Sequence, residues 1–274
     1  VLKEKSSLGH DFSLTRDDVQ NLGMICGGAV QVSFHYIPEN DEAYISLAKK
    51  ALELCAADED VWLISDIGKG GELSLYHAKE GFIGTDGGQW LIQHLGRQPK
   101  LIKENGREVY AEQIFSSGKV YIFGCGHVSQ ELVPVLSHVG FRCVAMDDRE
   151  EFANERLFPT AENVMLIDFE KIADYVTIKE NDYVCVMTRG HAYDTTVQAQ
   201  ILKTPACYIG VIGSKAKKAG VYQKLYGMGF TEADTDRITS PIGLSIKAET
   251  PAEIAISIAG QMIMHRSLRN QQKE

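Results

Sequence analysis

Residues 119–149 place glycines and acids in the order that dinucleotide-binding units use. An apolar run ends at Gly124 and Gly126, a helical pattern follows, and a second apolar run ends on Asp147 and Asp148. A glycine turn of this kind lets the backbone approach a phosphate, which the N–H groups of the next helix bind, and the later acid accepts ribose hydroxyls. The order predicts a nucleotide site, although a turn that binds nothing would show the same spacing.

Other polar residues of the same stretch are candidate ligand contacts. Cys125 and His127 lie in or beside the turn, and Arg149 follows the two acids. Ser129 occupies the place of the third glycine, so the helix should approach the strand less closely. Asp147 suits a free ribose 2′-hydroxyl, which would favour NAD over NADP in a dehydrogenase.

Two later loops follow apolar runs and also carry polar residues. Arg189, His191 and Asp194 follow the first of these runs and could project into the ligand crevice. A role in capping the next helix would explain Asp194, but it leaves Arg189 and His191 unexplained.

The second of these loops contains Gly213, Ser214 and Lys215. A glycine, a hydroxyl and a lysine at a helix N-terminus make a good anion cradle. The alternative, a solvated basic first turn, is unfavourable to the helix dipole.

Cys26 stands before Gly27 and Gly28, where exposed backbone N–H groups would favour a thiolate. A small buried residue before a bulge explains the same pattern equally well.

Composition describes an ordinary globular protein and excludes some partners. The chain has 274 residues, 44% hydrophobic and 24% charged, with a net charge of −9. An acidic chain is a poor general binder of nucleic acid or anionic membranes. Six scattered cysteines without metal-ligand spacing suggest reduced thiols and a cytoplasmic location. The apolar segment 254–264 is too short to span a bilayer, and no signal peptide is visible.

The apolar patterns predict two domains. Residues 1–114 read as a small α+β domain, with helices at 41–56 and 87–97 and strands in between and after. Residues 115–274 alternate strand and helix, which predicts a Rossmann-like, doubly wound parallel α/β sheet. Its strands are predicted at 119–124, 142–147, 163–167, 183–187, 207–212 and 237–240. Its helices are predicted at 127–139, 150–155, 169–174, 192–203, 215–228 and 250–268.

Five ordered motifs between residues 119 and 260 resemble the xanthine dehydrogenase accessory family (the XdhC/CoxI family). They are Gly124-Cys-Gly-His-Val-Ser129, Asp147-Asp-Arg-Glu-Glu-Phe152, Thr188-Arg-Gly-His191-x-x-Asp194, Gly210-x-Ile-Gly-Ser-Lys215 and Pro241-Ile-Gly-Leu with Thr250-Pro-Ala-Glu253. Met24-Ile-Cys26-Gly-Gly28 resembles part of that family's N-terminal domain, but the glycine- and serine-rich opening segment is absent.

The resemblance implies a maturation factor, or chaperone, without turnover of its own. It would bind the molybdenum cofactor, as molybdopterin or its cytosine dinucleotide form, assist its sulfuration and deliver it to a molybdenum hydroxylase apo-enzyme. It implies a homodimer, with a cysteine desulfurase as a further partner, and Cys26 as the metal-end ligand. An NAD(P)-dependent oxidoreductase or a nucleotide-dependent transferase that uses the same crevice is the second hypothesis, and an inactive homologue that bridges partners is the third.

Overall fold

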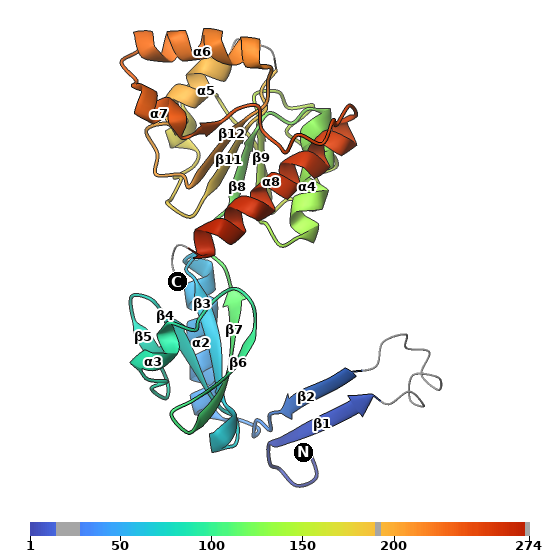
Figure 1. Cartoon of the computed structure of the whole chain (residues 1–274), viewed down its shortest axis with the longest axis vertical. Coiled ribbons are helices and arrows are strands. Elements are labelled where there is room, and N and C mark those ends of the chain that lie inside the picture. The colour runs from blue at the N-terminus through green and yellow to red at the C-terminus, as the bar shows by residue number, and fades with distance from the viewer. Residues whose placement is uncertain (15–27, 190–192, 272–274) are drawn as a thin grey trace. The chain divides into compact units, whose positions relative to one another are not determined.

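A computed structural model describes residues 1–14, 28–189 and 193–271 of the chain (Figure 1). The chain divides into two compact units, Val1–Ser117 and Gly118–Lys273, and each is described by itself. Among the described residues, no helix is long and apolar enough to cross a membrane.

The C-terminal unit is built on a six-stranded sheet in which every neighbouring pair is parallel. The order is β10-β9-β8-β11-β12-β13, which is the 3-2-1-4-5-6 order of a Rossmann fold. The predicted doubly wound α/β sheet is therefore confirmed. The strands are β8 Val120–Phe123, β9 Cys143–Asp147, β10 Asn163–Leu166, β11 Tyr183–Val186, β12 Tyr208–Val211 and β13 Ile238–Thr239.

Helices cover both faces of this sheet, which is why its central strands are apolar throughout. Along β8, Val120 and Ile122 enter one core and Tyr121 and Phe123 enter the other. The first core is closed by α4 and α8, which pack together, and the second by α5 and α6 (Figure 1). The helices are α4 His127–His138, α5 Asp194–Ile201, α6 Lys215–Gly227 and α8 Pro251–Gln271.

Two predicted helices of this unit are wrong. Residues 150–155 form turns, because six residues are too few for a helix without tertiary support and the Asn154 side chain accepts the Arg156 N–H. Residues 169–174 contain only the 3₁₀ turn η2, Ile172–Asp174. The short helix α7, Glu232–Asp236, was not predicted, and a capping box between Thr231 and Asp234 begins it.

The N-terminal unit contains an antiparallel five-stranded sheet in the order β5-β4-β3-β7-β6. The helix α2, Glu42–Ala56, matches the predicted 41–56, and the Asp41 carboxylate caps it by accepting the Tyr44 N–H. The predicted helix at 87–97 is shorter than expected, since only α3, Gln89–Ile92, forms. The strands are β3 Val61–Asp66, β4 Glu72–His77, β5 Gly81–Ile83, β6 Lys100–Glu104 and β7 Arg107–Phe115, and a separate hairpin pairs β1 Leu8–Leu14 with β2 Gly28–Phe34.

Candidate functional site

The candidate site lies at the carboxyl ends of the parallel strands. From β8 the strand order continues through β9 toward one edge of the sheet, and from β11 it continues through β12 toward the other edge. The switch point therefore lies between β8 and β11. Ligands of open α/β sheets bind in the crevice at this point. The loops after β8, β9, β11 and β12 carry the residues that the sequence singled out.

Gly124 is required where the loops after β8 and β11 meet. Its φ of +109° is a conformation that other residues rarely adopt. A Cβ built there would lie 2.3 Å from the Met187 carbonyl oxygen and 2.9 Å from the Thr188 Cα. The glycine therefore brings the two loops together at the switch point.

Gly126 is a glycine for a different reason. It is the N-cap of α4, with φ −71° and ψ −176°, a conformation open to any residue. A Cβ built there would meet nothing within 4 Å. The folded chain leaves space at this position, at the end of a helix whose first N–H groups can bind an anion.

Ser129 stabilises the turn from inside. It is buried, and its hydroxyl donates to the Gly124 carbonyl and lies against the Met187 sulfur. Gln130 adds to this by donating its side-chain amide to the Cys125 carbonyl. The serine that replaces the third glycine thus holds the turn.

Asp147 is 1% exposed and all its acceptor positions are engaged. Its Oδ2 accepts the Cys125 N–H at 2.7 Å and one Arg149 Nη at 3.1 Å. Its Oδ1 accepts the Arg149 Nε at 2.8 Å and the Arg149 backbone N–H at 3.1 Å. An ionised carboxylate offers about four such positions, so the groups of the turn and of Arg149 fill them.

The pKa values of the two adjacent acids shift in opposite directions. Burial alone would raise the pKa of Asp147, but the hydrogen bonds from Arg149 and the Cys125 N–H hold it below its usual value. Burial, and then the neighbouring Asp147 carboxylate, raises the pKa of Asp148. The Asp148 side chain is 25% exposed, so Asp148 is the accessible acid of the pair.

Arg149 is engaged on two sides by other residues of the chain. Its guanidinium binds Asp147 and lies 3.7 Å above the Phe152 ring. Sequence reasoning missed Phe152, although it is the last residue of the motif that begins at Asp147.

Cys125 is fully buried behind the turn. Burial, and then the Asp147 charge, raises the pKa of its thiol far above its ordinary value. Burial also raises the pKa of Cys143 to about 12 and of Cys207 to about 11, and that of Cys185 further still. None of these four cysteines offers a thiolate near neutral pH.

The remaining predicted residues lie at the rim or outside the described parts of the chain. His127 and Arg189 are exposed at their strand ends. Asp194 begins α5 and accepts a 2.5 Å hydrogen bond from the buried Thr188 hydroxyl, a partner that sequence reasoning missed.

The second loop is described in part. Gly213 has a φ of +155° and Ser214 is exposed. Lys215 begins α6. His191, Cys26 and the Lys215 side chain lie outside what the structure describes.

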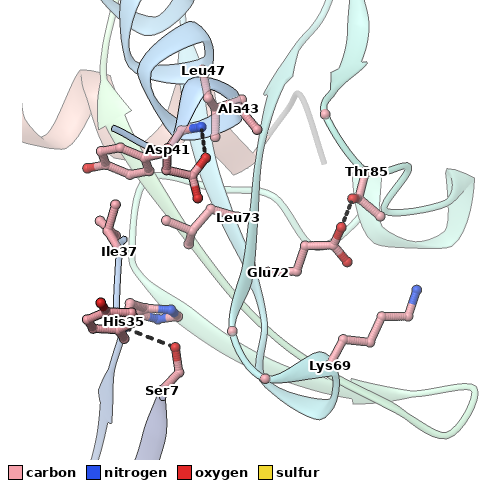
Figure 2. Close-up of a pocket in the computed structure, with 15 residues that line it drawn as sticks. Ser7, His35, Ile37, Asp41, Ala43, Leu47, Lys69, Glu72, Leu73 and Thr85 are labelled. Atoms are coloured by element: carbon pink, nitrogen blue, oxygen red, sulfur yellow. Dashed lines mark hydrogen bonds between the residues drawn. The ribbon is translucent and has the colours of Figure 1, made fainter. Parts of the chain in front are cut away.

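The N-terminal unit has a cavity of its own, of about 370 Å³ (Figure 2). Polar and apolar side chains both line it, and several are already engaged: Glu72 accepts from Thr85, and the Ser7 hydroxyl accepts the Tyr36 N–H. His35 lies against Gly71, where a Cβ would come within 2.4 Å of the ring. In the described part of the chain, no group of three His, Cys, Asp or Glu side chains could hold a metal ion.

A family model for the XdhC Rossmann domain matches residues 120–262, which span the whole sheet and its site. The chain belongs to this family. The XdhC Rossmann match covers every site residue predicted from the sequence except Cys26, so the glycine turn, the paired acids and the loop after β11 all lie in the family domain.

Two curated proteins are similar to part of this chain. YqeB, an uncharacterized protein of Escherichia coli K12, is 25% identical over 146 residues, which are 53% of this chain and 27% of that protein. A protein of Bacillus subtilis described as a probable xanthine dehydrogenase subunit is 24% identical over 158 residues, which are 58% of this chain and 46% of that one. This XdhC-family chain therefore matches about a quarter to a half of the length of its curated relatives.

A crystal structure of a xanthine dehydrogenase from Bacillus halodurans has the same fold as this XdhC-family chain. The TM-score is 0.77 at 24% identity, over 99% of this chain and 79% of that one.

Proposed function

We propose that this XdhC-family chain is a maturation factor that binds the molybdenum cofactor and delivers it to a xanthine dehydrogenase-type apo-enzyme. The observation that carries the proposal is the family match over residues 120–262. The Bacillus subtilis relative, described as part of a xanthine dehydrogenase, supports the choice of partner. The cofactor is cargo here, held by the chain and passed on.

The glycine turn fits the phosphate of such a cargo. Gly126 has open space where a side chain would stand, and α4 begins at the next residue with unpaired N–H groups. His127 and Arg189 lie exposed at two neighbouring strand ends and could add positive or hydrogen-bonding groups. These residues would bind the phosphate, while the rest of the cargo extends from the sheet edge.

The metal end of the cargo requires a soft ligand from elsewhere. Four described cysteines have raised thiol pKa values and are buried or half-buried. The family resemblance implies Cys26 as this ligand, and a cysteine desulfurase would be the sulfur donor.

A nucleotide-dependent oxidoreductase or transferase is the second candidate. The accessible acid Asp148, at the end of β9 in a Rossmann sheet, favours it, because that is where dehydrogenases bind a ribose.

Identification of the bound molecule tests the proposal. The chain should be purified under anaerobic, reducing conditions from cells supplied with molybdate, and the released ligand analysed by mass spectrometry. A pterin with molybdenum, together with activation of an apo-hydroxylase by the loaded protein, is the expected result. NAD(P) as the sole ligand, or no activation by a loaded protein, would refute the maturation role.

A further inference from the structure

The two adjacent acids at the end of β9, Asp147 and Asp148, differ in a way that divides their roles. Asp147 is buried, and each of its oxygens accepts two hydrogen bonds at 2.7 to 3.1 Å. A ribose hydroxyl could bind Asp147 only by displacing the Cys125 N–H or the Arg149 guanidinium. Either displacement would leave a partly buried donor without its acceptor, which is unfavourable.

Asp148 has the opposite surroundings. Its side chain is 25% exposed, and its contact to the Arg149 Nε is long, at 3.7 Å. Arg149 is itself committed to Asp147 and to the Phe152 ring. Asp148 therefore retains acceptor capacity at the end of β9, and its own negative charge would repel a 2′-phosphate.

From these contacts we infer that Asp148 selects ligands with a free ribose 2′-hydroxyl, and that Asp147 is a positioning residue that fixes the glycine turn for the diphosphate. The inference rests on the proposed site at the same turn. It makes a ribonucleotide diphosphate the ligand class, so the nucleotide-extended form of a pterin cargo would bind more tightly than the form that ends in a single phosphate.

Ribonucleotide probes distinguish the two roles. Binding of CDP, ADP, their 2′-deoxy analogues and inorganic pyrophosphate would be measured by calorimetry for the full chain and for D148N and D147N. In the wild type the ribonucleotides should bind about 10-fold more tightly than the deoxy forms, because one charge-assisted hydrogen bond is lost without the hydroxyl.

D148N should reduce the ratio of ribonucleotide to deoxynucleotide affinity to about one, and leave the affinity for pyrophosphate unchanged. D147N should weaken the binding of all five probes by a similar factor and leave the ratio of ribonucleotide to deoxynucleotide affinity unchanged. The ratio is independent of any loss of folded protein. If D147N does not fold, the D148N ratio decides by itself.

Three results would count against the inference, and one of them would also count against the nucleotide site itself. An unchanged ratio in D148N, or a ratio abolished by D147N with normal pyrophosphate binding, would overturn the division of roles alone. Failure of the folded wild type to bind any of the five probes would overturn the nucleotide site at the turn, and the inference with it.

Discussion

Substitutions at the two glycines of the turn should separate folding from ligand binding. At Gly124, alanine combines a left-handed φ of +109° with a Cβ 2.3 Å from the Met187 carbonyl oxygen. Backbone strain of about 1–3 kcal/mol and overpacking of about 1–3 kcal/mol together predict a loss of about 2–6 kcal/mol. For a unit of this size, each kcal/mol lowers Tm by about 2–4 °C.

At Gly126 the same change should have little effect on stability. The backbone is already in an ordinary extended conformation, and a Cβ would meet nothing within 4 Å. Alanine is a weaker N-cap than glycine by some tenths of a kcal/mol to about 1 kcal/mol, and a smaller unfolded-state entropy offsets about 0.4–1 kcal/mol of that. The free energy of unfolding should therefore change by less than about 1 kcal/mol.

Binding should follow the opposite order. Gly126→Val places a branched side chain where a phosphate must approach the backbone, so affinity for pyrophosphate and nucleotides should fall at least 10-fold while the protein stays folded. Urea unfolding and calorimetry on the same samples measure both quantities, with Gly227→Ala in α6 as a control, because that glycine also has open space around its Cβ. Unchanged affinity in a folded Gly126→Val variant would refute the phosphate site.

Three further predictions concern single side chains. Cys26→Ser should abolish cofactor retention, whereas the Cys125→Ser variant should retain the cofactor, because the raised pKa of Cys125 keeps that thiol neutral. Retention would be measured after anaerobic loading. If the working thiol lay in the turn, Cys125→Ser would lose the cofactor and Cys26→Ser would keep it. Arg189→Ala should weaken binding of pyrophosphate more at low salt than at high salt. If the substitution reduced the affinity by the same factor at both salt concentrations, Arg189 would be a solvated surface residue that does not contact the anion. Burial, and then the Arg269 charge, lowers the pKa of His265, so the folded state should lose stability as pH falls below the ordinary histidine value of 6.5, where the unfolded chain gains the proton; His265→Phe should reduce this loss in urea titrations at pH 7.5 and 5.5.

The strands of the C-terminal sheet were predictable because both of its faces are covered. Continuous apolar runs such as 183–187 have no polar alternation, and each ended within a residue or two of the observed strand. Helix prediction failed where the segment was short. Residues 150–155 have a helix-like composition, but so short a segment forms a stable helix only with tertiary support, which composition does not reveal.

The glycine turn was also predictable, since a strand, two glycines, a helix and an acid occur in a fixed order. The hydrogen-bond partners of the two acids were not predictable from the sequence. Asp147 and Asp148 are adjacent, identical in chemistry and both beyond the last apolar residue, so spacing alone assigned the ribose to Asp147. Only the parallel pairing of β8 with β9 shows that Asp147 lies beside the Cys125 N–H.

This arrangement changes what a loss of function at the site would mean. Residues that hold the turn contact one another and are mostly buried, whereas those that can meet a ligand are open or exposed. The first group comprises Gly124, Cys125, Ser129, Asp147, Arg149 and Thr188. The second comprises Gly126, His127, Asp148 and Arg189.

A substitution in the turn-holding group displaces the amides that would bind phosphate, so it reduces binding of every ligand without having touched one. Lost activity in such a variant cannot identify a ligand contact. A change in selectivity between ligands can identify one. A displaced turn weakens the binding of all phosphate ligands alike, whereas loss of a direct contact weakens only the binding of ligands that carry the contacted group. Selectivity between closely matched ligands is therefore the measurement that assigns roles at this turn, and Asp148 is the residue at which we expect selectivity to change.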